Sequence, residues 1–221
     1  METAKSLLEK ASSEEMRQTI ICCKDKSTFN NALHYAAQKN HVEFTTFLLE
    51  IIDPDNEMLV SVNNQQQNAL MEAAKTSVLR ISRAILEKVN EDSKILNAML
   101  TAKCNQKLSA INHAIRSTHK NSEKCAKIII SYFGDDSDVE QIFLPCLQLG
   151  DLKLAEKLWD RTKGDDALRK RLQDTKDKDG YNCFMLVSKN GQYECLKWLL
   201  TLNDDNPEEA DEDEKVCIHL M

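Results

Sequence analysis

The sequence predicts an all-α fold, a solenoid of stacked helix-turn-helix repeats joined by short hairpin loops. Three observations support this prediction. The 221 residues include only 5 Gly and 3 Pro, a scarcity that suits helices better than a fold rich in tight turns. A seven-residue motif recurs along the chain, and each copy is followed by a short polar stretch and a second apolar cluster. Such a helix pair cannot bury its apolar side alone, so neighbouring pairs have to stack.

The recurring motif marks five predicted repeats within residues 25–203. They begin near residues 31, 68, 109, 141 and 182, and read NALHYAA, NALMEAA, SAINHAI, QIFLPCL and NCFMLVS. The third position is always large and apolar: Leu33, Leu70, Ile111, Phe143 and Phe184. The sixth is small or medium, and this alternation on a helical period lets two helices lie close. The second clusters, which predict the outer helices, are FLL at 47–49, AIL at 84–86, III at 128–130, KLW at 157–159 and WLL at 198–200.

Residues 1–24 are predicted to form capping helices ahead of the first repeat. Ser12 and Glu15 have the spacing of a capping box, which marks a helix start. The residues that follow at helical spacing, and that we expect to cover the first repeat, are Met16, Thr19, Ile20 and Cys23.

The repeats are unevenly spaced, and two of them carry extra residues. The segments at 90–100 and 163–172 suit a longer outer helix or an added helical turn. Pro145 falls inside the first helix of the fourth repeat, where it removes a backbone hydrogen bond. We therefore expect that helix to start late.

Residues 204–221 are predicted to be an acidic linker followed by the start of a truncated sixth repeat. The linker reads DDNPEEADEDEK at 204–215, and its eight acids and one Lys account for the whole net charge of −7. The following VCIHLM aligns with the first repeat, and Ile218 takes the place of its large apolar residue. On this reading the chain is the N-terminal part of a longer protein.

The repeats resemble the ankyrin repeat, whose signature runs T-P-L-H-x-A-A-x-x-G-H-x-E-V-V-x-L-L-L. The match is closest over residues 31–49, where the matching residues are Asn31, Ala32, Leu33, His34, Ala36, Ala37, His41, Glu43, Phe47, Leu48 and Leu49. The tip DGYN at 179–182 and the segment GDLKLAEKLW at 150–159 continue the likeness in later repeats. The sequence departs from the pattern in repeat length, and among the five repeats only His34 keeps the signature histidine. The resemblance implies an ankyrin-type α-solenoid in which that histidine is structural.

No catalytic, cofactor or metal site is predicted. The chain has no phosphate-binding glycine loop and no nucleophile elbow. His113 and His119 are six residues apart, which places them on different sides of a helix. The eight cysteines form no CxxC pair, and we expect them to be reduced, buried and inert.

The predicted function is therefore recognition of another protein by a cytoplasmic monomer that is not an enzyme. No stretch is long and apolar enough to span a membrane, and nothing basic is concentrated enough to suggest nucleic acid. The resemblance implies that partners bind the concave side, formed by hairpin tips and inner helices. The positions that map there are Tyr35, Gln38, Glu72, Lys75, His113, Arg116, Lys189, Asn64, Gln65, Gln66 and Lys178.

Two alternatives remain open at this point. The array could be the regulatory N-terminal part of a larger effector, such as a TRP-type ion channel or a multidomain enzyme. A stand-alone helical enzyme would instead need an activity that survives substitution across the concave side.

Overall fold

The computed structural model describes residues 10–11, 13–53, 57–133 and 139–203. All regular secondary structure in these ranges is helical, as the sequence predicts. The chain divides into two compact units, Met1–Ser137 and Asp138–Met221. Unit 1 contains α2 (Glu14–Cys22), α3 (Ala32–Gln38), α4 (Val42–Ile51), α5 (Glu57–Val60), α6 (Ala69–Lys75), α7 (Leu79–Val89), α8 (Ser93–Thr101), α9 (Ala110–Arg116) and α10 (Ser122–Ser131). Unit 2 contains α11 (Val139–Leu149), α12 (Leu152–Asp160), α13 (Asp166–Asp174), α14 (Cys183–Lys189) and α15 (Tyr193–Asn203).

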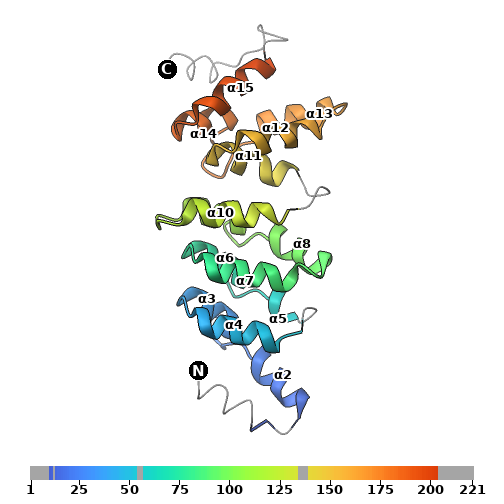
Figure 1. Cartoon of the computed structure of the whole chain (residues 1–221), viewed down its shortest axis with the longest axis vertical. Coiled ribbons are helices and arrows are strands. Elements are labelled where there is room, and N and C mark those ends of the chain that lie inside the picture. The colour runs from blue at the N-terminus through green and yellow to red at the C-terminus, as the bar shows by residue number, and fades with distance from the viewer. Residues whose placement is uncertain (1–9, 12, 54–56, 134–138, 204–221) are drawn as a thin grey trace. The chain divides into compact units, whose positions relative to one another are not determined.

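Unit 1 is a stack of three helix pairs, each with a short first helix and a longer second one. The pairs are α3 with α4, α6 with α7, and α9 with α10. The short helices α3, α6 and α9 lie beside one another in sequence order, and so do the long helices α4, α7 and α10. Figure 1 shows the long helices as successive rungs. This two-layer stack confirms the predicted α-solenoid architecture.

The short helices begin where the sequence provides a capping side chain. The Oδ1 atoms of Asn31, Asn68 and Asn182 accept the backbone N–H three residues later, at 3.0, 2.9 and 2.9 Å. At Ser109 a capping box forms instead, in which the Ser109 N–H and hydroxyl both donate to Asn112 Oδ1. Each cap satisfies groups that the first helical turn leaves without intrahelical partners.

The extra residues between repeats form separate short helices. Segment 90–100 contains most of α8, and segment 163–172 contains most of α13. A further short helix, α5, precedes the second repeat at a place that the sequence analysis did not single out. Met58 in α5 and Met99 in α8 are buried, and their carbonyls accept the Nδ2 hydrogens of Asn31 and Asn68 at 3.2 and 3.0 Å. The cap asparagines therefore also connect each short helix to the segment that leads to the next pair.

The hairpin tips of unit 1 are joined to one another through their backbones. Within the second tip Asn63 N donates to Gln67 O at 3.0 Å, and Cys104 and Leu108 close the third tip in the same way. Between tips, Asn64 N donates to Thr28 O at 2.9 Å and Asn105 N donates to Gln65 O at 3.0 Å. The three tips consequently form one continuous row.

Unit 2 packs around an aromatic core, and its first helix differs from the prediction. The rings of Phe143, Trp159 and Trp198 lie with centroids 5.9 to 6.4 Å apart. The expectation that α11 starts late is wrong, since this helix already includes Val139 and carries Pro145 in its interior. Pro145 costs one backbone hydrogen bond, and the burial of Phe143 and Leu147 on the same helix offsets that loss.

The start of α2 also corrects a prediction. Ser13 caps this helix by accepting Met16 N at 3.1 Å, so the cap is not Ser12. Met16 and Thr19 are exposed, whereas Ile21 is buried. Three of the four predicted covering residues, Met16, Thr19 and Cys23, therefore point to solvent, and Ile20 is half-buried. The predicted divisions at residues 24 and 203 stay predictions, and the predicted sixth repeat lies outside the described residues.

Candidate protein-interaction surface

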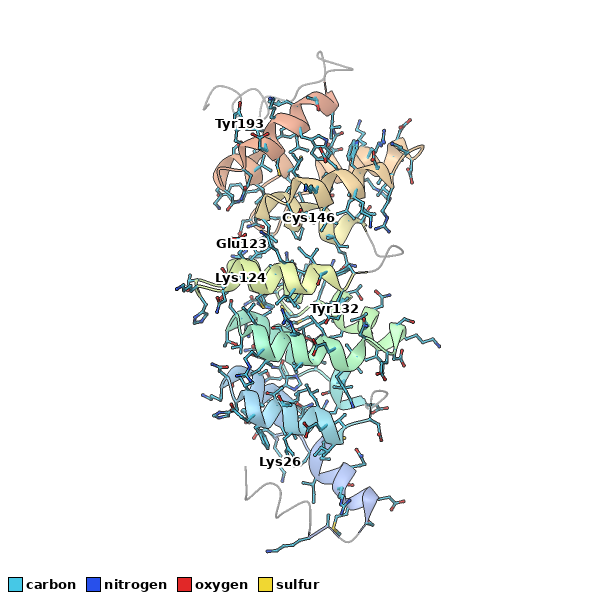
Figure 2. All side chains as sticks on the ribbon, viewed as in Figure 1. Lys26, Glu123, Lys124, Tyr132, Cys146 and Tyr193 are labelled. Atoms are coloured by element: carbon cyan, nitrogen blue, oxygen red, sulfur yellow. The ribbon has the colours of Figure 1, made fainter. Side chains whose placement is uncertain are left out.

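We define the inner face of unit 1 as the hairpin tips 24–31, 61–68 and 102–109 together with the short helices α3, α6 and α9 and the residue that follows each. The tips are joined by the backbone hydrogen bonds described above, and the three helices are neighbours. Figure 2 shows the side chains on this framework, with Lys26 on the first tip.

Most predicted contact residues of unit 1 are accessible on the inner face. The exposed ones are Tyr35, Gln38, Asn64, Gln65, Gln66 and Arg116. Lys75 is half-buried, because its Nζ donates to Gln67 Oε1 at 2.6 Å. The structure thus brings these seven residues onto one surface.

Glu72 and His113 are the exceptions, and their predicted accessibility is wrong. Only 3% of Glu72 and 7% of His113 is exposed. The second hairpin covers both residues, since Asn63 Nδ2 donates to Glu72 Oε1 at 3.3 Å and Gln67 Nε2 lies 3.5 Å from His113 Nε2. The side chains of Glu72 and His113 therefore contact the second hairpin and are not exposed on the inner face.

The first repeat displays two exposed aromatic rings, one on its hairpin tip and one on its short helix. Phe29 is 52% exposed and adopts φ 59°, and Tyr35 on α3 is 38% exposed. Asp25 orders the tip by accepting hydrogen bonds from the backbone N–H groups and hydroxyls of Ser27 and Thr28. These hydrogen bonds hold the pKa of the Asp25 carboxyl well below its usual range, and the bond from the Ser27 hydroxyl has the largest effect. Because the Thr28 hydroxyl donates to Asp25, the Tyr35 hydroxyl is the donor in its 3.1 Å bond to Thr28 Oγ1.

Sequence reasoning missed Phe29, although a signal for it exists. Tips two and three each place a residue with positive φ two residues before the residue that caps the short helix, at Gln66 and Lys107. Aligning the first tip with these would have placed Phe29 at the same outward position.

The comparison with known protein families agrees with this architecture. Residues 1–95 match the family model of ankyrin repeats (3 copies). Residues 1–95 of this chain therefore contain ankyrin repeats. A search among curated proteins returned no match to its sequence.

The signature histidine of these ankyrin repeats is structural, as the resemblance implies. His34 is fully buried, its Nε2–H donates to the Gln67 carbonyl at 2.8 Å, and its Nδ1 lies 2.6 Å from Asn31 Oδ1 and 3.4 Å from Asn31 N. Burial lowers the pKa of His34, so its neutral form is favoured. The ring therefore connects the first short helix to the second hairpin.

Lys178 and Lys189 belong to unit 2. Both are exposed, Lys178 on the tip 177–181 and Lys189 at the end of α14. Lys189 Nζ lies 4.0 Å from the centroid of the Tyr181 ring, a cation–π contact. Exposed Tyr193 on α15 is labelled in Figure 2.

No metal-binding arrangement is found in the described part of the chain. No group of three or more His, Cys, Asp or Glu side chains there could hold a metal ion. Five cysteines are buried, and burial raises the pKa of the Cys125, Cys146 and Cys195 thiols, whereas Cys23 is exposed. Over the same residues, no helix has both the length and the apolar character that a membrane span requires.

Proposed function

We propose that this protein is a non-catalytic interaction module that binds another protein on the inner face of unit 1. Ankyrin repeats are generally protein–protein interaction modules and are typically non-catalytic. The observation that carries the proposal is the pair of exposed rings, Phe29 on the ordered first tip and Tyr35 on α3, whose hydroxyl bonds to Thr28 of that tip. Tyrosine anchors of this kind contribute much of the binding energy in protein interfaces.

The order of the inner face before binding also supports this function. Asp25 organises the first tip, and backbone bonds between Asn64 and Thr28 align the first two tips. Side chains on such a framework lose little conformational entropy when a partner binds. We also propose that the protein acts as a monomer, which light scattering after gel filtration would test.

Site-specific photo-crosslinking tests the proposed face. A photoreactive amino acid at Gln38 or Gln66 is expected to capture the same partner, whereas the same group at Glu50 on α4 or Glu87 on α7 is expected to capture none. Tyr35→Ala should reduce the captured amount about tenfold or more, because truncating an aromatic anchor costs roughly 2 kcal/mol. An unchanged circular dichroism spectrum is the control for folding. Equal capture from the inner and outer positions would refute the proposal.

A further inference from the structure

Positive charge in unit 1 is concentrated on the inner face, although the residues that carry it are distributed over three repeats. The tips and short helices at 24–39, 61–76 and 102–117 contain seven Lys or Arg and only two acids. The other described segments of unit 1, at 10–11, 13–23, 40–53, 57–60, 77–101 and 118–133, contain nine Lys or Arg and ten acids. The fold therefore concentrates positive charge on the inner face of a chain whose net charge is −7.

The two acids of the inner face are already engaged. Asp25 accepts hydrogen bonds within its own tip, and Glu72 is buried against Asn63 with Lys75 Nζ 3.4 Å from its Oε1. In contrast, six of the seven cations are exposed: Lys24, Lys26, Lys39, Lys103, Lys107 and Arg116. A ligand at this face consequently meets more exposed lysines than carboxylates, since Asp25 is the one exposed acid and Glu72 is buried.

Four of the six exposed cations lie at the two ends of the row of tips, with neutral amides between them. Lys24 and Lys26 belong to the first tip, and Lys103 and Lys107 belong to the third. The second tip exposes three neutral side chains, Asn64, Gln65 and Gln66. Carboxamides can donate to and accept from the backbone of an extended peptide, and the flanking ammonium groups can pair with carboxylates.

We propose that the inner face of unit 1 binds an acidic peptide segment that carries an apolar residue. This inference rests on the proposed function and names the chemical class of the partner. The apolar residue packs against Phe29 and Tyr35, the backbone lies along the amides of the second tip, and carboxylates pair with lysines of the first and third tips.

A peptide fits these features better than a nucleic acid. Single-stranded nucleic acids follow a continuous basic groove along their phosphates, whereas the second tip has no exposed cation. The neutral second tip offers no partner to a nucleic acid, which carries a phosphate charge on every nucleotide. It suits a polypeptide whose carboxylates are spaced along the chain.

Fluorescence anisotropy with the full chain tests the proposal. The probe is a fluorescein-labelled, glutamate-rich synthetic peptide with one central phenylalanine. Two control probes have every Glu replaced by Gln, or the phenylalanine replaced by alanine. We expect the acidic probe to bind about tenfold more tightly than either control, and its affinity to fall with added salt.

Two matched sets of variants locate the binding site. The first is Lys26→Gln, Lys103→Gln and Lys107→Gln together. The second, with the same change in charge, is Lys94→Gln, Lys124→Gln and Lys153→Gln, at exposed positions outside the inner face. Figure 2 labels Lys26 and Lys124, one residue from each set. Losing three exposed ion pairs should weaken binding about tenfold in the first set, and binding in the second should stay within about twofold of the unchanged protein.

Three results would overturn the inference. They are failure to prefer the acidic probe over its Gln control, equal losses in the two variant sets, and tighter binding of a single-stranded DNA oligonucleotide of matched charge. Crosslinking from Gln66 separates this failure from failure of the proposed function. Capture that depends on Tyr35 and persists in the first variant set would retain the inner face as the binding site and reject only the acidic class of partner.

Discussion

Asn68 offers the sharpest test of how the repeats hold together. Its buried side chain makes two hydrogen bonds of different kinds. Oδ1 accepts Met71 N–H at 2.9 Å and caps α6, while Nδ2 donates to the Met99 carbonyl at 3.0 Å and connects α6 to α8. Substitution to alanine removes both bonds, whereas substitution to serine retains an oxygen that can cap the helix.

The expected destabilisation follows from these two bonds. Loss of the cap costs about 1 kcal/mol, and a buried carbonyl left without a donor costs about 1–3 kcal/mol. We therefore expect Asn68→Ala to lower the free energy of unfolding by about 2–4 kcal/mol. Asn68→Ser should lower it by only about 1–3 kcal/mol, because it loses only the bond to Met99.

Urea denaturation followed by far-ultraviolet circular dichroism measures this difference. Tryptophan fluorescence provides an internal comparison, since the chain has only 2 Trp, and both Trp159 and Trp198 lie in unit 2. A loss below about 0.5 kcal/mol for Asn68→Ala, within the range of an ordinary surface substitution, would refute the reasoning. So would a serine variant that is as unstable as the alanine variant.

Three further predictions concern backbone strain and protonation. Gly150→Ala should destabilise unit 2 by about 1–2 kcal/mol more than Gly164→Ala in tryptophan-monitored unfolding. Both glycines have positive φ, so both substitutions strain the backbone. At Gly150 the added Cβ would also collide with the Gln192 side chain, whereas at Gly164 it would meet no atom within 4 Å. Lys107→Gly should stabilise the protein by about 0.5–1 kcal/mol in urea unfolding, because Lys107 has φ 60°. Burial lowers the pKa of His34 from 6.5, so the unfolded chain binds a proton that the folded chain resists, and stability should fall as the pH drops through 6.5. Urea unfolding at a series of pH values should show a shallower decline for His34→Gln; an unchanged decline would contradict this assignment.

The helix pairs were predictable because their determinants are local. Asn31, Asn68, Ser109 and Asn182 open the motif in the sequence and cap helices in the structure. The large third residue of each motif, such as Leu33 or Phe184, is buried as its period indicates. Pro145 misled the prediction because local propensity counts its lost hydrogen bond, whereas the packing around α11 depends on residues distant in sequence.

The accessibility of the candidate site was less predictable. Glu72 and His113 have positions on their helices that face the inner side, yet the hairpin residues Asn63 and Gln67 cover them. Exposure there depends on side chains from another segment, which helical periodicity does not describe. The concentration of cations on the inner face escaped prediction for the same reason, since its lysines are distributed over three repeats.

The hairpin tips of unit 1 hold non-glycine residues in a strained backbone conformation, which lowers stability but provides side chains for the inner face. Phe29, Gln66 and Lys107 have φ of 59°, 58° and 60°, a conformation that glycine adopts at much lower cost. These residues supply an aromatic ring, a carboxamide and a cation to the inner face, the three kinds of group that the proposed peptide contacts. Lys107→Gly should therefore raise stability and weaken binding of the acidic probe, whereas Lys103→Gln should weaken binding without any gain in stability. A glycine variant that is both more stable and equally able to bind would show that Lys107 has no role in recognition.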